Sequence, residues 1–119
     1  MISTPLYDHA AHPRHRQEDA HDAPYKGHAA NPMCGDVLDV GVWCEEGNIV
    51  RAVFAGKGCA VCIGSASLLC SYIQGKTTQE AFAMIKENPC VHLQGERIGL
   101  MREGCAQVIS IAFLRALSS

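Results

Sequence analysis

Three cysteines in this chain come just before a predicted strand or helix. Cys34 lies in the stretch NPMCGDVLDV, two residues ahead of Asp36, where a polar segment gives way to alternating apolar residues. Cys59 follows a glycine-rich turn, and Cys105 precedes the last apolar stripe of the chain. Tight turns and helix N-termini present unpaired N–H groups that stabilise a thiolate. The three thiols are therefore candidate metal ligands or nucleophiles, and folding would have to bring them together because they lie far apart in the sequence.

The other cysteines have less distinctive positions. Cys62 lies one helical turn after Cys59, in CAVC, and is either a fourth thiolate ligand or part of an apolar helix stripe. Cys44 and Cys70 lie on apolar faces and are expected to be small buried hydrophobes. Cys90 lies in a predicted loop, and the sequence assigns it no role.

The apolar pattern predicts the elements that position these thiols. Alternation over 35–44 and 49–56 predicts an antiparallel β-hairpin. Apolar residues at helical spacing then predict three helices, which begin near Cys59, Thr77 and Cys105. The expected fold class is α+β, a small antiparallel sheet with one face covered by helices.

The N-terminal segment, 1–30, differs from the rest in composition. It is polar and holds most of the histidines of the chain, namely His9, His12, His15, His21 and His28. One short helix over PLYDHAAH, ended by Pro13, is expected there, followed by a loop. We therefore predict a helix-and-loop arm over 1–30 and the main part of a single domain over 31–119.

Composition excludes several classes of protein. The 119 residues are 48% hydrophobic, which suits one domain with one core. A net charge of -2 argues against a nucleic-acid partner. No apolar run is long enough to span a membrane, and the N-terminus lacks the order of a secretory signal. A cytoplasmic protein without a membrane partner is expected, and there thiols are more often ligands than disulfides.

Four stretches, in this order, resemble the U-type iron-sulfur cluster scaffold family, which comprises IscU, SufU and the N-terminal domain of NifU. They are YDHAAHPRH, NPMCGD, GKGCAVCIGSAS and REGCAQVISIAFLRAL, and the likeness extends over about residues 6 to 117. The resemblance implies a SufE/NifU-like sandwich in which four side chains meet at one exposed end, namely Cys34, Asp36, Cys59 and Cys105.

The resemblance also implies a function. In such a scaffold, sulfur arrives from a cysteine desulfurase, iron joins it at these four residues, and a transient [2Fe-2S] cluster passes to apo iron-sulfur proteins. Cys105 is expected to be the first persulfide acceptor, and Cys34 is the other candidate. Asp36 is a harder ligand than a thiolate and would release the metal more easily. The histidine-rich arm is expected to dock the desulfurase.

Two alternatives stay open because the sequence departs from the IscU pattern. Gly104 stands where IscU-type members carry a histidine, and IGLMR replaces their chaperone-recognition stretch, so docking of an Hsp70-type chaperone is not expected. In lacking this histidine the chain resembles SufU, a sulfurtransferase that holds Zn²⁺ with three cysteines and an aspartate. Unlike SufU, however, the chain has no insertion between the second and third cysteines of the site. The other alternative is an inert, zinc-stabilised interaction module.

Overall fold

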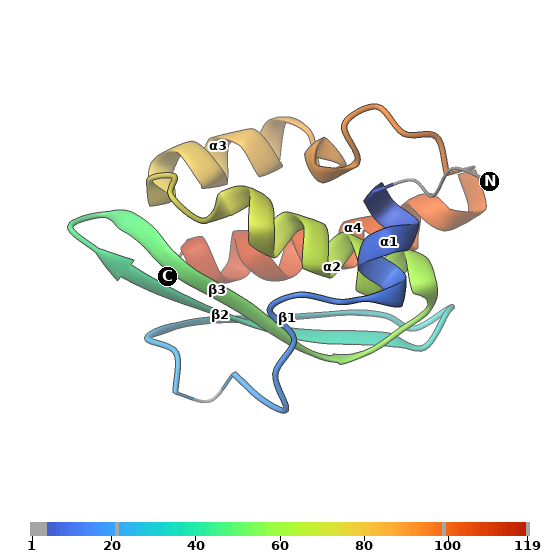
Figure 1. Cartoon of the computed structure of the whole chain (residues 1–119), viewed down its shortest axis with the longest axis horizontal. Helices are drawn as coiled ribbons and strands as arrows, with labels where there is room; N and C mark the ends of the chain where they lie inside the picture. The colour runs from blue at the N-terminus through green and yellow to red at the C-terminus, as the bar shows by residue number, and fades with distance from the viewer. Residues whose placement is uncertain (1–4, 21, 99, 119) are drawn as a thin grey trace.

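A three-stranded antiparallel sheet forms one layer of the molecule and helices form the other (Figure 1). The computed structural model describes residues 5–20, 22–98 and 100–118. The strands are β1 (Tyr25–Asn31), β2 (Asp36–Glu45) and β3 (Asn48–Lys57), and they lie side by side in chain order. Because side chains alternate across a strand, the sheet turns one apolar row toward the helices, and Leu38, Val40 and Val42 are buried in it.

Two helices cover that apolar face. They are α2 (Ala60–Ile73), which packs on β3, and α4 (Leu100–Leu117), which packs on β1 and β2 (Figure 1). An outer row lies against them: α1 (Pro5–Ala11) packs on α2, α3 (Thr78–Glu87) packs on α4, and the short η1 (Val91–Leu93) packs on α2. The predicted α+β class is confirmed.

Local sequence signals set the helix ends. The Thr77 hydroxyl accepts from the Glu80 N–H at 3.0 Å, and the Glu80 carboxylate accepts from the Thr77 N–H at 3.2 Å. This capping box satisfies two N–H groups that the first turn of α3 would otherwise leave unpaired. None of the described helices is both long and apolar enough to cross a lipid bilayer.

The loop predicted over the second half of the N-terminal segment is wrong for Tyr25–Asn31, which forms β1. This strand escaped prediction because its inward positions are small. At Gly27 an added Cβ would lie only 1.9 Å from the carbonyl oxygen of Ala112, so α4 can approach β1 only because a glycine is there. Ala29, the next inward residue, is buried against the same core cluster.

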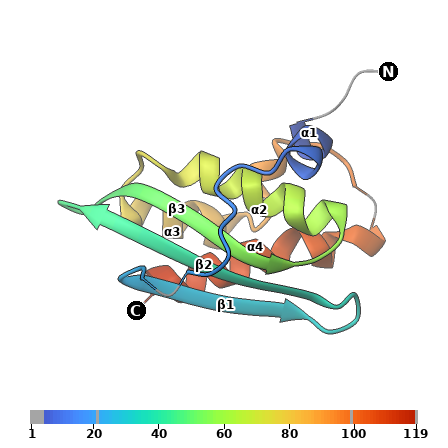
Figure 2. The same cartoon turned by 60° about the horizontal axis from the view of Figure 1, so that its bottom comes forward.

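The segment between α1 and β1 is tied to the sheet. Figure 2 shows it crossing the sheet on the side away from the helices. The Gln17 N–H donates to the carbonyl of Phe54 at 2.8 Å, and the Phe54 N–H donates to the carbonyl of His15 at 3.0 Å. Beyond this point Ala20 and Ala23 pack on Gly41 of β2. The segment therefore covers part of the second sheet face.

Candidate metal centre

Cys34 lies in the tight turn between β1 and β2, at one end of the sheet. Its N–H donates to the carbonyl of Asn31 at 3.1 Å, and Gly35 follows with a φ of 73°, a conformation that favours glycine. The Cys34 side chain is exposed. The prediction that Cys34 immediately precedes a strand is confirmed, and the turn presents its thiol to solvent.

Asp36 is the first residue of β2 and points toward the helices, in the same row as Leu38. Its side chain is 0% exposed. One carboxylate oxygen, Oδ1, accepts a hydrogen bond from the Cys59 N–H at 3.0 Å. The other, Oδ2, is buried and finds no hydrogen-bond partner among the described residues. A buried carboxylate oxygen without a donor is costly, and a metal ion would satisfy it.

Cys59 is the N-cap residue of α2, as the strand-to-helix turn predicted. Its backbone is extended, and its side chain makes no capping hydrogen bond. The half-buried thiol is therefore not engaged in holding the helix end. The N–H bond to Asp36 fixes the position of Cys59 relative to β2.

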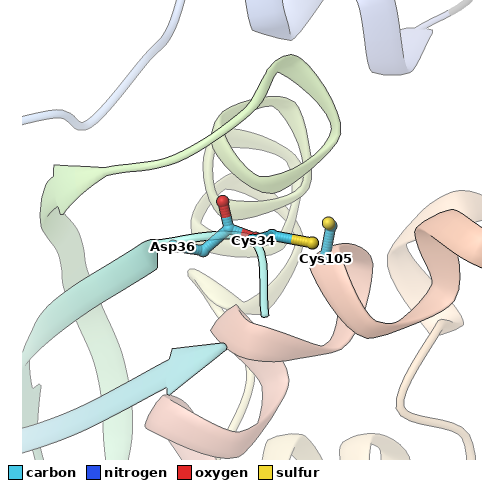
Figure 3. A group of neighbouring side chains, drawn as sticks. All are labelled: Cys34, Asp36 and Cys105. Carbon is cyan, nitrogen blue, oxygen red and sulfur yellow. The ribbon is translucent and has the colours of Figure 1, made fainter. Parts of the chain in front are cut away.

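Cys105 approaches from α4. Donor atoms of Cys34, Asp36 and Cys105 all lie within 4.8 Å of one another (Figure 3). Figure 3 shows the Cys34 side chain extending toward Cys105, so that the two sulfur atoms lie next to each other, with Asp36 on the other side of Cys34. Burial raises the pKa of the Cys105 thiol, and so do its interactions with Asp36, Cys34 and Cys59.

The expected position of Cys105 at the start of its helix is wrong. The last helix begins at Leu100, so Cys105 lies in its second turn and not among the free N–H groups of its N-terminus. Cys105 is also buried, at 1% exposure, whereas an exposed site was expected. The structure therefore surrounds one exposed thiol, Cys34, with partly or fully buried partners.

Cys62, the alternative fourth ligand, lies beside the site but outside the group within 4.8 Å. A Cβ added to Gly58 would be 2.6 Å from the Cys62 sulfur and 2.8 Å from Oδ1 of Asp36. The sulfur and the carboxylate therefore both border the space left by this glycine. Burial, followed by the charges of Asp36, Cys59 and Cys34, raises the pKa of the Cys62 thiol to about 12. Without a metal it stays protonated near neutral pH.

Gly58 is the residue of the site that the sequence analysis did not single out. The only signal was its place immediately before Cys59. A side chain there would separate Asp36 from Cys62, since both lie closer to the missing Cβ than ordinary van der Waals contact permits.

The remaining cysteines and the histidines lie elsewhere. Cys70 is buried and Cys44 half-buried, in agreement with packing roles. His9 contacts the Ser67 hydroxyl at 2.7 Å, and His28 contacts Asp39 at 2.7 Å. These histidines have separate partners and do not join the thiols. His21 lies outside the described residues.

The donor set suits a soft or borderline metal. Thiolates bind zinc and iron tightly, and a carboxylate adds a harder oxygen ligand. Cys34, Asp36 and Cys105 supply three donors within 4.8 Å of one another. Cys59, the fourth predicted ligand, lies outside this group, and its N–H is bonded to Asp36. The residues present therefore fit either a zinc ion or an iron-sulfur cluster.

Known proteins are similar to this chain in sequence and in fold. The family model described as "NifU-like N terminal domain" matches residues 2–119. A scaffold protein for iron-sulfur cluster assembly, IscU 1 of Archaeoglobus fulgidus, is 27% identical over 117 residues, covering 98% of this chain and 74% of the relative. The zinc-dependent sulfurtransferase SufU of Bacillus subtilis is 34% identical over 56 residues, covering 47% of this chain and 38% of that protein.

A solved structure agrees with these relatives. A protein of Fervidobacterium islandicum AW-1, assigned to the SUF system as an iron-sulfur cluster assembly scaffold, superposes with a TM-score of 0.78. It is 25% identical, and the alignment covers 98% of this chain and 96% of that one.

Proposed function

The chain belongs to the NifU-like N-terminal domain family, and from this premise we propose that it is a scaffold on which a transient [2Fe-2S] cluster is assembled. Sulfur comes from a cysteine desulfurase, and the finished cluster passes to apo iron-sulfur proteins. The observation that carries the proposal is that donor atoms of Cys34, Asp36 and Cys105 lie within 4.8 Å of one another. The backbone N–H of Cys59 donates a hydrogen bond to Asp36. These four residues are the proposed cluster ligands.

Exposure assigns different tasks to the two persulfide acceptors. A desulfurase must bring its persulfide into contact with a thiol, and Cys34 is exposed whereas Cys105 is buried. We therefore place the first acceptor at Cys34, in place of the Cys105 that the resemblance favoured. The Cys105 sulfur lies within 4.8 Å of the Cys34 sulfur and then receives sulfur from it or binds iron.

Asp36 is the proposed release point. A carboxylate binds these metals more weakly than a thiolate does, so the ligand set has one bond that opens first. Burial of Asp36 keeps water from competing while the cluster is held. The exposed Cys34 then leaves one side of the cluster open to an acceptor protein.

The second candidate function is a zinc-dependent sulfurtransferase. Gly104 in place of the IscU histidine and the similarity to SufU favour it. Zinc would be held by the same four residues and, when bound, would keep their thiols deprotonated. Cys34, as the exposed ligand, would accept the sulfur.

Anaerobic reconstitution separates the two functions. Purified protein, whose bound zinc is measured first, is incubated with ferrous iron, cysteine, a cysteine desulfurase and an external dithiol, and iron, sulfide and visible absorption are measured. Persulfide on the cysteines is measured in a parallel sample without the dithiol. The scaffold function predicts the absorption and stoichiometry of a [2Fe-2S] cluster in wild type and in Cys70→Ser, but not in Cys59→Ser. A tightly bound zinc ion that iron does not displace, with persulfide on Cys34 and no chromophore, would establish the sulfurtransferase instead.

A further inference from the structure

Cys59 and Cys62 form a dithiol at the start of α2. Cys59 is the N-cap residue and Cys62 follows three positions later. Cα atoms three positions apart across the first turn of a helix are separated by about 5 Å. That lies inside the range of about 4.4–6.8 Å that a disulfide requires.

The direction of the Cys62 side chain supports this pairing. Its sulfur lies 2.6 Å from the position that a Gly58 Cβ would occupy, so it points back toward the N-terminal end of the helix. Cys62 is completely buried, while Cys59 is half-buried. One thiol of the pair is therefore reachable and the other is shielded, the arrangement needed for a reactive cysteine and a resolving cysteine.

Short distances within the metal centre connect the Cys59–Cys62 pair to the surface. Cys34 is exposed and its sulfur lies within 4.8 Å of the Cys105 sulfur. Cys59 lies at the edge of this group, because its N–H donates to Oδ1 of Asp36 at 3.0 Å. We infer that a sulfane sulfur received at Cys34 passes by way of Cys105 to Cys59. At each transfer the acceptor thiolate attacks the outer sulfur of the persulfide, and the donor cysteine leaves as a thiolate that takes up a proton.

We propose that Cys59 and Cys62 act as an internal two-electron reductant, which converts a cysteine persulfide into sulfide at the metal centre. At the start of this step the persulfide, received from Cys34, is carried on Cys59. The Cys62 sulfur attacks the Cys59 sulfur, the Cys59–Cys62 disulfide forms, and the bond between the Cys59 sulfur and the terminal sulfur breaks. The terminal sulfur leaves as hydrosulfide and takes the Cys62 proton, so the sulfane sulfur gains the two electrons that the two thiols lose.

This reaction supplies what a cluster needs, since cluster sulfur is sulfide and not sulfane sulfur. The inference rests on the proposed function for its source of persulfide. The disulfide withdraws Cys59 from the ligand set until an external dithiol reduces it. Each sulfide released therefore consumes one external dithiol.

Sulfide release from a persulfide-loaded chain tests the proposal. Reduced, metal-free protein is loaded with glutathione persulfide, desalted, and assayed for free sulfide and intact mass without any reductant. Wild type is expected to release about one sulfide per loaded chain and to lose two hydrogen atoms in mass, with peptide mapping placing the disulfide at Cys59–Cys62. Cys62→Ser should keep its persulfide and release at least about tenfold less sulfide. Cys70→Ser, a buried cysteine of the same helix, should behave as wild type.

Two results would overturn the proposal: equal sulfide release from Cys62→Ser and wild type, or a wild-type disulfide that maps to another pair. Equilibration of wild type in a glutathione redox buffer gives the disulfide position without any variant. The small-molecule donor makes this test independent of the desulfurase. With an external dithiol and a desulfurase, Cys62→Ser should still assemble a cluster. If it and wild type both fail to do so, the scaffold function is wrong, whatever the sulfide-release assay shows.

Discussion

Gly58→Ala should disable the metal centre although it adds only one methyl group. The new Cβ would lie 2.6 Å from the Cys62 sulfur and 2.8 Å from Oδ1 of Asp36. Ordinary contacts of a Cβ begin near 3.4 Å, so the sulfur must retreat by about 0.8 Å and the carboxylate by about 0.6 Å. Both side chains are completely buried.

Two general magnitudes give the expected size of this effect. Overpacking a buried site by one methyl group costs about 1–3 kcal/mol. Displacing Asp36 also weakens its bond to the Cys59 N–H, which holds the two elements of the site together. A misplaced ligand lowers metal affinity by about 10- to 100-fold. We expect both losses in the variant.

Competition with a chromophoric chelator measures zinc affinity, and urea unfolding of the metal-free chain measures stability. Gly104→Ala is the matched control, because its Cβ would meet only the Asn31 amide nitrogen at 3.2 Å. As a helix-interior change it should leave metal affinity unchanged and raise stability by up to about 1 kcal/mol. Zinc affinity in Gly58→Ala equal to that of wild type would refute the placement of Asp36 and Cys62.

Three further predictions follow from single residues. Asp36→Asn keeps an oxygen for the Cys59 N–H but removes the weakly binding carboxylate, and the neighbouring Cys62 thiol can take its place and hold the cluster longer. Cluster should still assemble, and transfer should slow by about tenfold; unchanged transfer kinetics to an apo-ferredoxin would contradict the release role. Cys59→Ser should lower bound metal per chain, measured by elemental analysis, while Cys70→Ser should not; equal loss in both would mean that folding had failed. Burial lowers the pKa of His92 to about 4, so its contribution to stability is complete above pH 6.5 and is lost as the pH falls toward 4. Between pH 7.5 and 5, the free energy of unfolding of metal-free wild type should fall by about 2 kcal/mol more than that of His92→Gln. An equal fall in both proteins, measured by urea unfolding, would show that His92 is not the cause.

The sequence predicted the parts of the site that local pattern controls. The turn before β2 and the N-cap of α2 follow from glycine and apolar spacing, so Cys34 and Cys59 were placed correctly. The start of α4 was not predicted, because the glycine before Cys105 resembles a helix boundary although the helix already runs through it.

Other features depend on tertiary contacts that no local pattern contains. β1 is a strand because α4 packs onto its glycine and alanine, and neither residue favours a strand alone. The convergence of Cys105 with Cys34 was expected only from the resemblance to a family. The direction of the Cys62 sulfur and the close packing around Gly58 became visible only in the structure.

Cluster transfer tests the central claim most directly. Protein loaded with a [2Fe-2S] cluster is mixed with an apo-ferredoxin in the presence of an iron chelator, and ferredoxin maturation is followed by circular dichroism. The account predicts transfer faster than assembly from free iron and sulfide, and insensitive to the chelator. Maturation no faster than from free iron and sulfide, or abolished by the chelator, would contradict it.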